Sequence, residues 1–178
     1  MSARFHTEAI ERRLRQMRVR APALVARALN RAGGSARTLM VREVSRDLRL
    51  KAGTVRDRIL VRQASADRLV YRLAASLKRI PVYAFDARGP LPSRGQGRGV
   101  TAKTPARRYP HAFLARMRSG HVGVFQRVGR KRLAIRELMG PSVGHVFHRH
   151  VAAGMARGEE QLVKNLQHEL RFASLAGE

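Results

Sequence analysis

Residues 109–143 read YPHAFLARMRSGHVGVFQRVGRKRLAIRELMGPSV, and this stretch decides the fold. The pattern predicts three short strands joined by tight turns, at residues 111–117, 124–128 and 133–138. Gly120 and Gly129 mark the turns, because glycine reaches positive φ at little cost. The hydroxyl of Ser142 is expected to cap the backbone N–H groups of a helix that follows.

A long helix is expected upstream, at residues 22–48, with Pro22 in its first turn. Its apolar residues recur every three or four positions and form one stripe: Val25, Leu29, Ala32, Ala36, Met40, Val44 and Leu48. Gly33 and Gly34 interrupt the helical pattern, so either the helix kinks there or another backbone packs close to it. The opposite face carries arginines that meet solvent, a polyanion or another subunit: Arg27, Arg31, Arg42, Arg46 and Arg49.

Further strand-like runs follow the helix, at residues 59–61, 69–77 and 80–85. Thr54 is expected to cap a short helical turn before the first run. In the second run, alternate apolar residues take one face: Leu69, Tyr71, Leu73, Ala75 and Leu77. Pro81 places the third run at an edge or at the start of a strand. These runs imply an α+β fold, in which the long helix covers one face of an antiparallel sheet.

The chain is strongly basic, with 37 Lys and Arg residues, 12 Asp and Glu residues and a formal net charge of +25. Residues 87–136 hold 13 of the basic residues and no acidic one. Residues 88–108 are rich in glycine and proline, which predicts a long, mobile basic hairpin loop. A compact body this basic repels itself unless anions or acidic neighbours surround it.

Helical periodicity returns after Val143, and Gly158 is expected to break it. Residues 158–178 contain four acidic and two basic residues, so this segment is expected to dock on a basic surface of this chain or of a neighbour. The sequence therefore divides into a single α+β domain at residues 1–157 and an acidic helical extension at residues 158–178.

The sequence shows no motif for catalysis, and we expect neither an enzyme nor a bound cofactor or metal. It contains no cysteine, which excludes disulfides and thiolate metal sites. His145, His148 and His150 cluster, but no acid lies in the same turn to complete a metal site. No apolar run reaches about 18 residues, so no membrane span is expected. The N-terminal residues also lack the apolar stretch of a secretory signal.

The 109–143 stretch resembles the minor tail protein Z family of tailed bacteriophages. The residues that carry the resemblance are Ala112, Phe113, Met117, Gly120, His121, residues 123–125, Arg127, Gly129 with the basic turn at residues 130–132, Ile135, Glu137, Leu138 and residues 140–143. Residues 28–31, 50–53, Val55 and residues 59–61 match the same pattern upstream. The resemblance covers residues 24–143.

The resemblance implies a structural protein of the virion, which completes the tail at its head-proximal end and is made in the host cytoplasm. It also implies a homohexameric ring that joins the tail tube or terminator protein to the head–tail connector. Genome DNA would pass through the lumen of this ring. The alternative is a sequence-independent nucleic-acid-binding protein outside the virion, and a third class is an enzyme that depends on Asp86 or Glu137.

Basic residues of the strands and loops are the candidate contacts to DNA or to acidic partners: Arg94, Arg98, Lys103, Arg107, Arg108, Arg116, Arg118, Arg130, Lys131 and Arg132. Strand periodicity places Arg116 and Arg118 on one face. The candidate subunit-interface residues are Glu137 and Pro141. Glu137 is also expected to pair with Arg127 or Arg132. The aromatic residues Phe113 and Phe125 are expected in the core rather than as base-stacking platforms.

Overall fold

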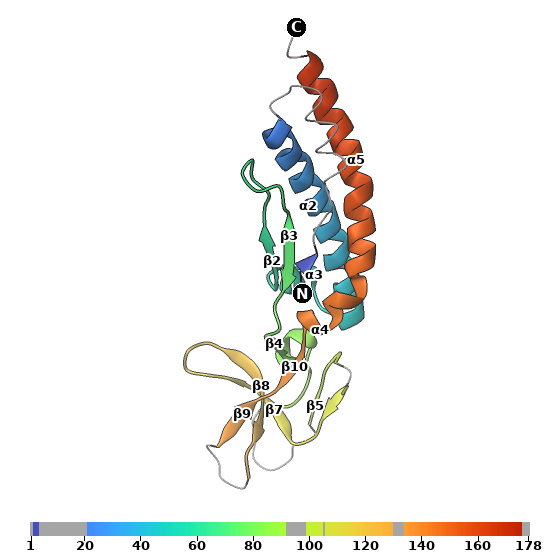
Figure 1. The fold of residues 1–178 in the computed structure, drawn as a ribbon. Helices are drawn as coiled ribbons and strands as arrows, with labels where there is room; N and C mark the ends of the chain where they lie inside the picture. The colour runs from blue at the N-terminus through green and yellow to red at the C-terminus, as the bar shows by residue number, and fades with distance from the viewer. Residues whose placement is uncertain (1, 4–20, 92–98, 105, 130–133, 176–178) are drawn as a thin grey trace.

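The computed structural model describes residues 2–3, 21–91, 99–104, 106–129 and 134–175, and the molecule is elongated (Figure 1). Two long helices, α2 (Ala21–Leu48) and α5 (Val151–Leu175), lie side by side and form the helical end. They run antiparallel, since Arg27 in the first part of α2 pairs with Glu169 late in α5. A group of short strands forms the opposite end, which we call the β end (residues 82–138).

Helix α2 has the predicted boundaries to within one residue, and all seven residues of its predicted apolar stripe are buried. The helix is continuous through Gly33 and Gly34, which the sequence predicted to mark either a kink or a close approach of another backbone. A Cβ atom on Gly33 would lie 2.2 Å from the ring of Tyr71, whereas one on Gly34 would meet nothing within 4 Å. Gly33 therefore makes room for an aromatic side chain, not for another backbone.

A small antiparallel sheet lies beside α2, in the order β1 (Ser2–Ala3), β3 (Arg72–Ala75), β2 (Ile59–Arg62). The short helix α3 (Ala52–Arg56) precedes β2. Lys51 occupies its N-cap position and Thr54 lies inside the helix, so the predicted Thr54 cap is wrong. Strand β3 ends before Leu77, whose side chain is 72% exposed although it was expected on the buried face.

The chain passes from the helical end to the β end through β4 (Arg79–Pro81) and returns through β10 (Met139–Ser142). These strands pair antiparallel with a bulge between Met139 and Ser142. Arg79 donates from Nε to the Gly140 carbonyl oxygen at 3.1 Å and from Nη2 to the Met139 carbonyl oxygen at 2.9 Å. After Pro81 the predicted third strand gives way to a 3-10 helix, η1 (Val82–Phe85).

The β end contains a hairpin of β5 (Val100–Thr101) and β6 (Arg108–Tyr109). Beside it lies a three-stranded antiparallel sheet, which is the main feature predicted from residues 109–143. Its strands are β7 (Ala112–Arg116), β8 (Val122–Arg127) and β9 (Ile135–Glu137). Thus the expected three strands are confirmed, with boundaries moved by a few residues.

The C-terminal helices start at α4 (Val143–Phe147), which continues through the 3-10 helix η2 (His148–His150) into α5. Ser142 takes the N-cap position of α4, but its Oγ bonds His145 Nδ1 at 2.7 Å in place of a backbone N–H, so the capping bond is wrong. Helix α5 passes through a buried Gly158 without interruption, and the expected break is also wrong. The division of the chain at residue 157 stays a prediction.

Two apolar clusters hold the molecule together. One joins the C-terminal half of α2 to α4, the small sheet and the β end, and includes Met40, Phe85, Val124 and Phe147. The other packs Leu162 and Leu166 of α5 on the first turns of α2. The α+β class with a long N-terminal helix and C-terminal helices is therefore confirmed. None of the described helices is long and apolar enough to cross a membrane.

Candidate basic interface

Half of the predicted basic contact residues fall within the described part of the chain. Lys103, Arg107, Arg108, Arg116 and Arg118 all belong to the β end and are all exposed. The others lie outside the described residues: Arg94, Arg98, Arg130, Lys131 and Arg132. The extended basic hairpin stays a prediction, because residues 92–98 at its centre are among these.

The C-terminal side of the predicted hairpin is folded into the β end. Val100 and Thr104 are buried, and the Thr104 hydroxyl lies 2.8 Å from the Tyr109 hydroxyl. The Ala102 N–H donates to the Arg107 carbonyl oxygen at 2.9 Å, which closes the turn between β5 and β6. Arg107 itself has a φ of 55° in this turn. These bonds fix the backbone of the turn, from which the side chains of Arg107 and the following Arg108 are exposed to solvent.

Lys103 has an acidic partner inside the chain. Its Nζ lies 2.9 Å from Asp86 Oδ2, and an Arg88 Nη2 lies 3.7 Å from the same oxygen. The hydrogen bond and charge of Lys103, with a further contribution from Arg88, lower the pKa of Asp86. Lys103 is therefore partly neutralised before any partner arrives.

Arg116 and Arg118 do not share a strand face, so that prediction is wrong. Strand β7 ends at Arg116, and a tight turn follows, in which the Gly120 N–H donates to the Met117 carbonyl oxygen at 2.9 Å. Gly120 has a φ of 83°, as the glycine pattern predicted. Both arginines are exposed at this tip of the sheet.

One face of the β7–β8–β9 sheet carries an aromatic and charged cluster. Phe113 lies opposite Phe125, with ring centroids 6.4 Å apart, and Phe125 lies opposite Glu137. The Arg127 guanidinium sits 5.5 Å from the centre of the Phe113 ring. Phe125 is buried, as expected, while Phe113 is only half-buried.

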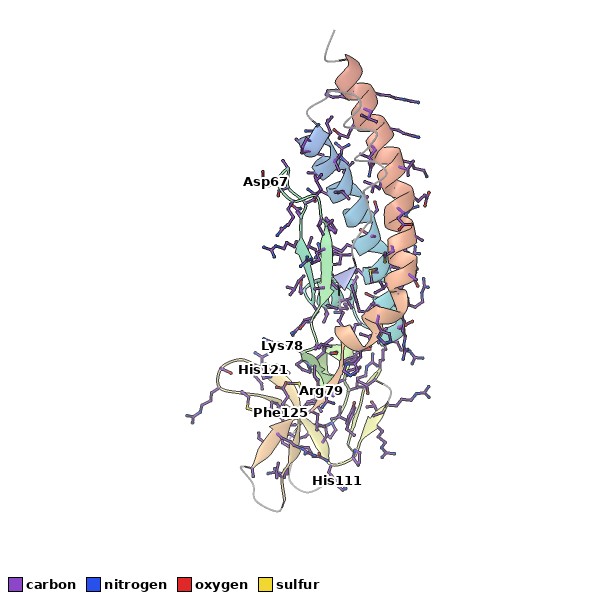
Figure 2. All side chains as sticks on the ribbon, viewed as in Figure 1. Asp67, Lys78, Arg79, His111, His121 and Phe125 are labelled. Carbon is purple, nitrogen blue, oxygen red and sulfur yellow. The ribbon has the colours of Figure 1, made fainter. Side chains whose placement is uncertain are left out.

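His121 completes this cluster; the sequence singled it out as part of the family pattern but did not predict its partners. Its ring meets Phe125 edge-on, and its Nε2 lies 2.9 Å from Glu137 Oε1. The expected partners of Glu137 were Arg127 and Arg132; the first instead stacks on Phe113, and the second is outside the described residues. Figure 2 shows His121 and Phe125 in the β end, away from Asp67 at the helical end. The alternation of β8, which brings residues 123 and 125 onto one face, was the available signal.

Pro141 lies in the bulge of β10, where its missing N–H costs no ladder bond. The neighbouring Gly140 packs on Phe85, since a Cβ there would lie 2.6 Å from the ring. This geometry gives the 140–142 segment an internal role at the connection between the two ends. A contact of Glu137 or Pro141 with another subunit stays a prediction.

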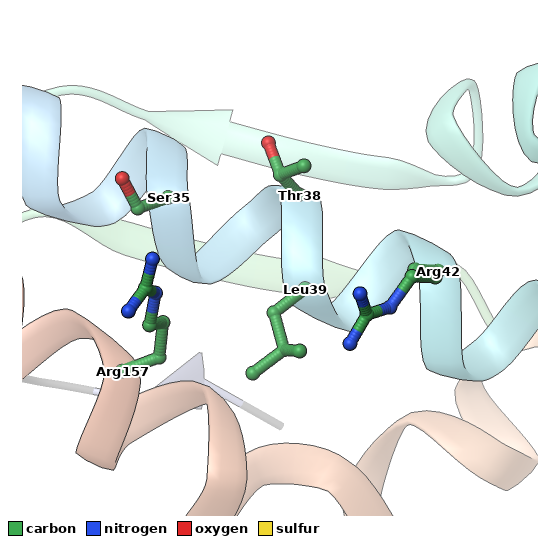
Figure 3. Close-up of a pocket in the computed structure, with 5 residues that line it drawn as sticks. All are labelled: Ser35, Thr38, Leu39, Arg42 and Arg157. Carbon is green, nitrogen blue, oxygen red and sulfur yellow. The ribbon is translucent and has the colours of Figure 1, made fainter.

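A groove of about 460 Å³ opens between α2 and α5 (Figure 3). Ser35, Thr38, Leu39, Arg42 and Arg157 line it. Arg42 pairs with Glu43 at 3.1 Å and Arg157 with Glu160 at 2.8 Å, and both hydroxyls donate to backbone carbonyl groups of α2. Each polar side chain of this groove therefore already has a partner within the chain.

His145 and His150, which lie close together in the sequence, bond different partners in the structure. His145 bonds Ser142, and His150 Nε2 lies 2.9 Å from Asp47 Oδ2 of α2. Among the residues that the structure describes, no three His, Cys, Asp or Glu side chains group closely enough to hold a metal ion.

Comparison with known proteins gives one match. A family model described as prophage minor tail protein Z matches residues 6–174, a range that takes in both the helical end and the β end. No match was found among curated proteins or among solved structures.

Proposed function

Because the chain belongs to the prophage minor tail protein Z family, and is thus a structural protein of a phage tail, we propose that it completes the tail at its head-proximal end. In this proposal six copies form a ring, made in the host cytoplasm. The ring joins the tail tube or terminator protein to the head–tail connector, and DNA passes through it. The role is structural and requires no reaction at Asp86 or Glu137.

The observation that supports the DNA contact is the density of positive charge in the β end, where residues 87–136 hold 13 basic residues and no acidic one. At the helical end, acidic residues pair with arginines inside the chain: Glu169 with Arg27 and Arg31, and Glu43 with Arg42 and Arg46. These pairs compensate part of the positive charge there, although other arginines of the helical end, such as Arg37 and Arg56, have no carboxylate within 4 Å among the described residues.

The β end has only two carboxylates for its many basic residues. Its two carboxylates are engaged locally, Asp86 by Lys103 and Glu137 by His121. Within the described residues, Arg107, Arg116 and Arg118 are exposed and have no carboxylate within 4 Å. Positive charge without an internal partner favours phosphates at the surface. We therefore orient the β end toward the lumen.

The DNA contact is testable with matched pairs of substitutions. Arg116→Gln with Arg118→Gln removes two unpaired charges, whereas Arg42→Gln with Arg46→Gln removes two paired ones. For double-stranded DNA of random sequence, the first pair should reduce the slope of log K against log salt by about 2, since each phosphate contact contributes about 0.9. The second pair should leave the slope nearly unchanged. Equal effects of both pairs would contradict a contact specific to the β end.

The position in the particle is tested by cryo-electron microscopy of intact virions. A ring of this chain between connector and tail tube, with the β end facing the lumen, supports the proposal. The same ring with the arginines against acidic subunits would replace the DNA contact by a protein contact. Absence of the chain from the particle would favour the alternative of a free nucleic-acid-binding protein.

A further inference from the structure

A second groove, of about 400 Å³, lies between α2 and the β2–β3 hairpin. One face of α2 supplies its floor through residues spaced by about one helical turn: Asn30, Gly34, Arg37, Thr38 and Val41. Arg56 of α3, Val61 and Gln63 of the β2 segment, and Tyr71 before β3 supply the walls. The helix and the hairpin are fastened together at one end of the groove. There the Asn30 amide bonds the backbone of Ala64 in both directions, at 3.0 and 2.8 Å.

Arg37 is the lining residue of this groove that has a buried donor without a partner among the described residues. Its Nη2 donates to the Arg56 carbonyl oxygen at 3.3 Å, while its Nε is buried and has no hydrogen-bond partner. Buried donors are normally paired, so an unpaired one points to a missing acceptor. Within the described residues, neither Arg37 nor Arg56 has a carboxylate within 4 Å. The groove is thus lined by two arginines, Arg37 and Arg56, that have no carboxylate partner in the described part of the chain.

Tyr71 gives the groove a wall of low polarity. Its side chain is 4% exposed and is wedged against Gly33 of α2. Burial raises the pKa of Tyr71, and the nearby charge of Arg37 acts in the opposite direction. A charge beside such a wall is less well hydrated than at an open surface, which strengthens its attraction for an anion.

We infer that this groove binds the carboxylate of an Asp or Glu side chain presented by a neighbouring protein subunit. A guanidinium matches the two oxygens of a carboxylate in a planar, bidentate pair. Because Arg37 Nε is enclosed, binding requires the Arg37 side chain to turn its free Nε–H toward the groove. A recess of this size admits a side chain, while a DNA duplex suits the exposed arginines of the β end better. Only the source of the carboxylate, another tail protein, rests on the proposed function.

The test is nuclear magnetic resonance of the full chain with a probe that carries one side-chain carboxylate, acetyl-glutamate amide. The Nε–Hε resonance of Arg37, identified by its absence in Arg37→Lys, should shift saturably with the probe. The backbone amides of Gly34 and Val61 report binding in every variant and also show that each variant is folded. We expect Arg37→Lys and Arg56→Gln each to weaken binding by about tenfold. Arg62→Gln, which removes a charge outside the groove, should leave binding unchanged.

Three outcomes overturn the inference. The first is no saturable shift, and the second is the same shift with chloride at equal ionic strength. The third is tighter binding of inorganic phosphate than of the probe, which would assign the groove to a phosphate-bearing partner. Because the measurement uses the isolated chain, its failure leaves the tail-completion proposal untouched. Absence of the chain from virions would in turn leave the groove result standing.

Discussion

Gly33 and Gly34 offer a sharp test of how α2 packs, because neighbouring glycines in one helix should respond to alanine with opposite signs. Alanine is favoured over glycine in a helix interior by about 1 kcal/mol. At Gly34 nothing lies within 4 Å of the added methyl group. Gly34→Ala should therefore raise the free energy of unfolding by about 1 kcal/mol.

At Gly33 the same substitution creates a collision. The added Cβ would lie 2.2, 2.3 and 2.4 Å from three ring atoms of Tyr71, while carbon atoms pack at about 3.5–4.0 Å. The buried ring must move by more than about 1 Å, and overpacking of this kind costs about 1–3 kcal/mol or more. After the helix gain is subtracted, we expect Gly33→Ala to lower the free energy of unfolding by about 2 kcal/mol. The two alanine variants should thus differ by about 3 kcal/mol.

Urea unfolding followed by far-ultraviolet circular dichroism measures this difference. A double-mutant cycle with Tyr71→Leu isolates the collision, because the smaller, flexible side chain should remove most of the penalty at Gly33. If Gly33→Ala were as stable as the unchanged protein, the ring could not occupy the notch in α2. Destabilisation by Gly34→Ala would contradict the open space described at that position.

Other predictions concern single polar contacts, with unfolding by urea as the measurement unless stated. Glu169→Gln should cost about 1–3 kcal/mol, since a buried carboxylate loses its charge pairing with half-exposed arginines, whereas the exposed Glu159→Gln should change stability by less than about 0.5 kcal/mol. Asn30→Ala should cost about 1–3 kcal/mol through the loss of two backbone bonds, and Asn30→Asp, which keeps the acceptor, should cost less. Lys103→Gln should raise the pKa of Asp86 toward its ordinary value in an NMR titration. Because the folded pKa of Asp86 is the lower one, its stabilisation is complete above the ordinary pKa and is lost as pH falls through the depressed one. Asp86→Asn should accordingly reduce the fall in the free energy of unfolding at acid pH. An unchanged dependence on pH in that range would contradict this.

Local sequence patterns predicted the helix and the strands whose apolar and polar residues recur with a regular period. The stripe on α2 was readable because a helix that buries one face repeats its apolar residues every three or four positions. The sheet at residues 112–137 was readable because glycine-containing turns separate its strands. The exposure of Arg107, Arg116 and Arg118 also followed from the local sequence.

Contacts between segments that are far apart in the chain could not be predicted from the sequence. Gly158 has poor helix propensity, but α5 continues through it because Leu162 and Leu166 beyond it are buried against α2. Nothing in the sequence near Gly33 indicates that Tyr71 fills the space beside it. The pairings of Lys103 with Asp86 and of Glu137 with His121 likewise depend on how strands return across the β end. The burial of Arg37 Nε has the same origin, since α3 and the β2–β3 hairpin together enclose it.

The antiparallel pairing of α2 with α5 also has a consequence for the order of events during synthesis. Arg27 and Glu169 are 142 residues apart in sequence, so α2 emerges from the ribosome long before the helix that covers it. Closing a loop of that length costs about 4 kcal/mol in chain entropy, which only the completed helix pair can offset. The β end, built from hairpins of neighbouring residues, can form in the meantime. During that interval the first turns of α2 expose Val25 and Leu29 to water, and a chaperone that holds this surface would raise the yield of folded protein.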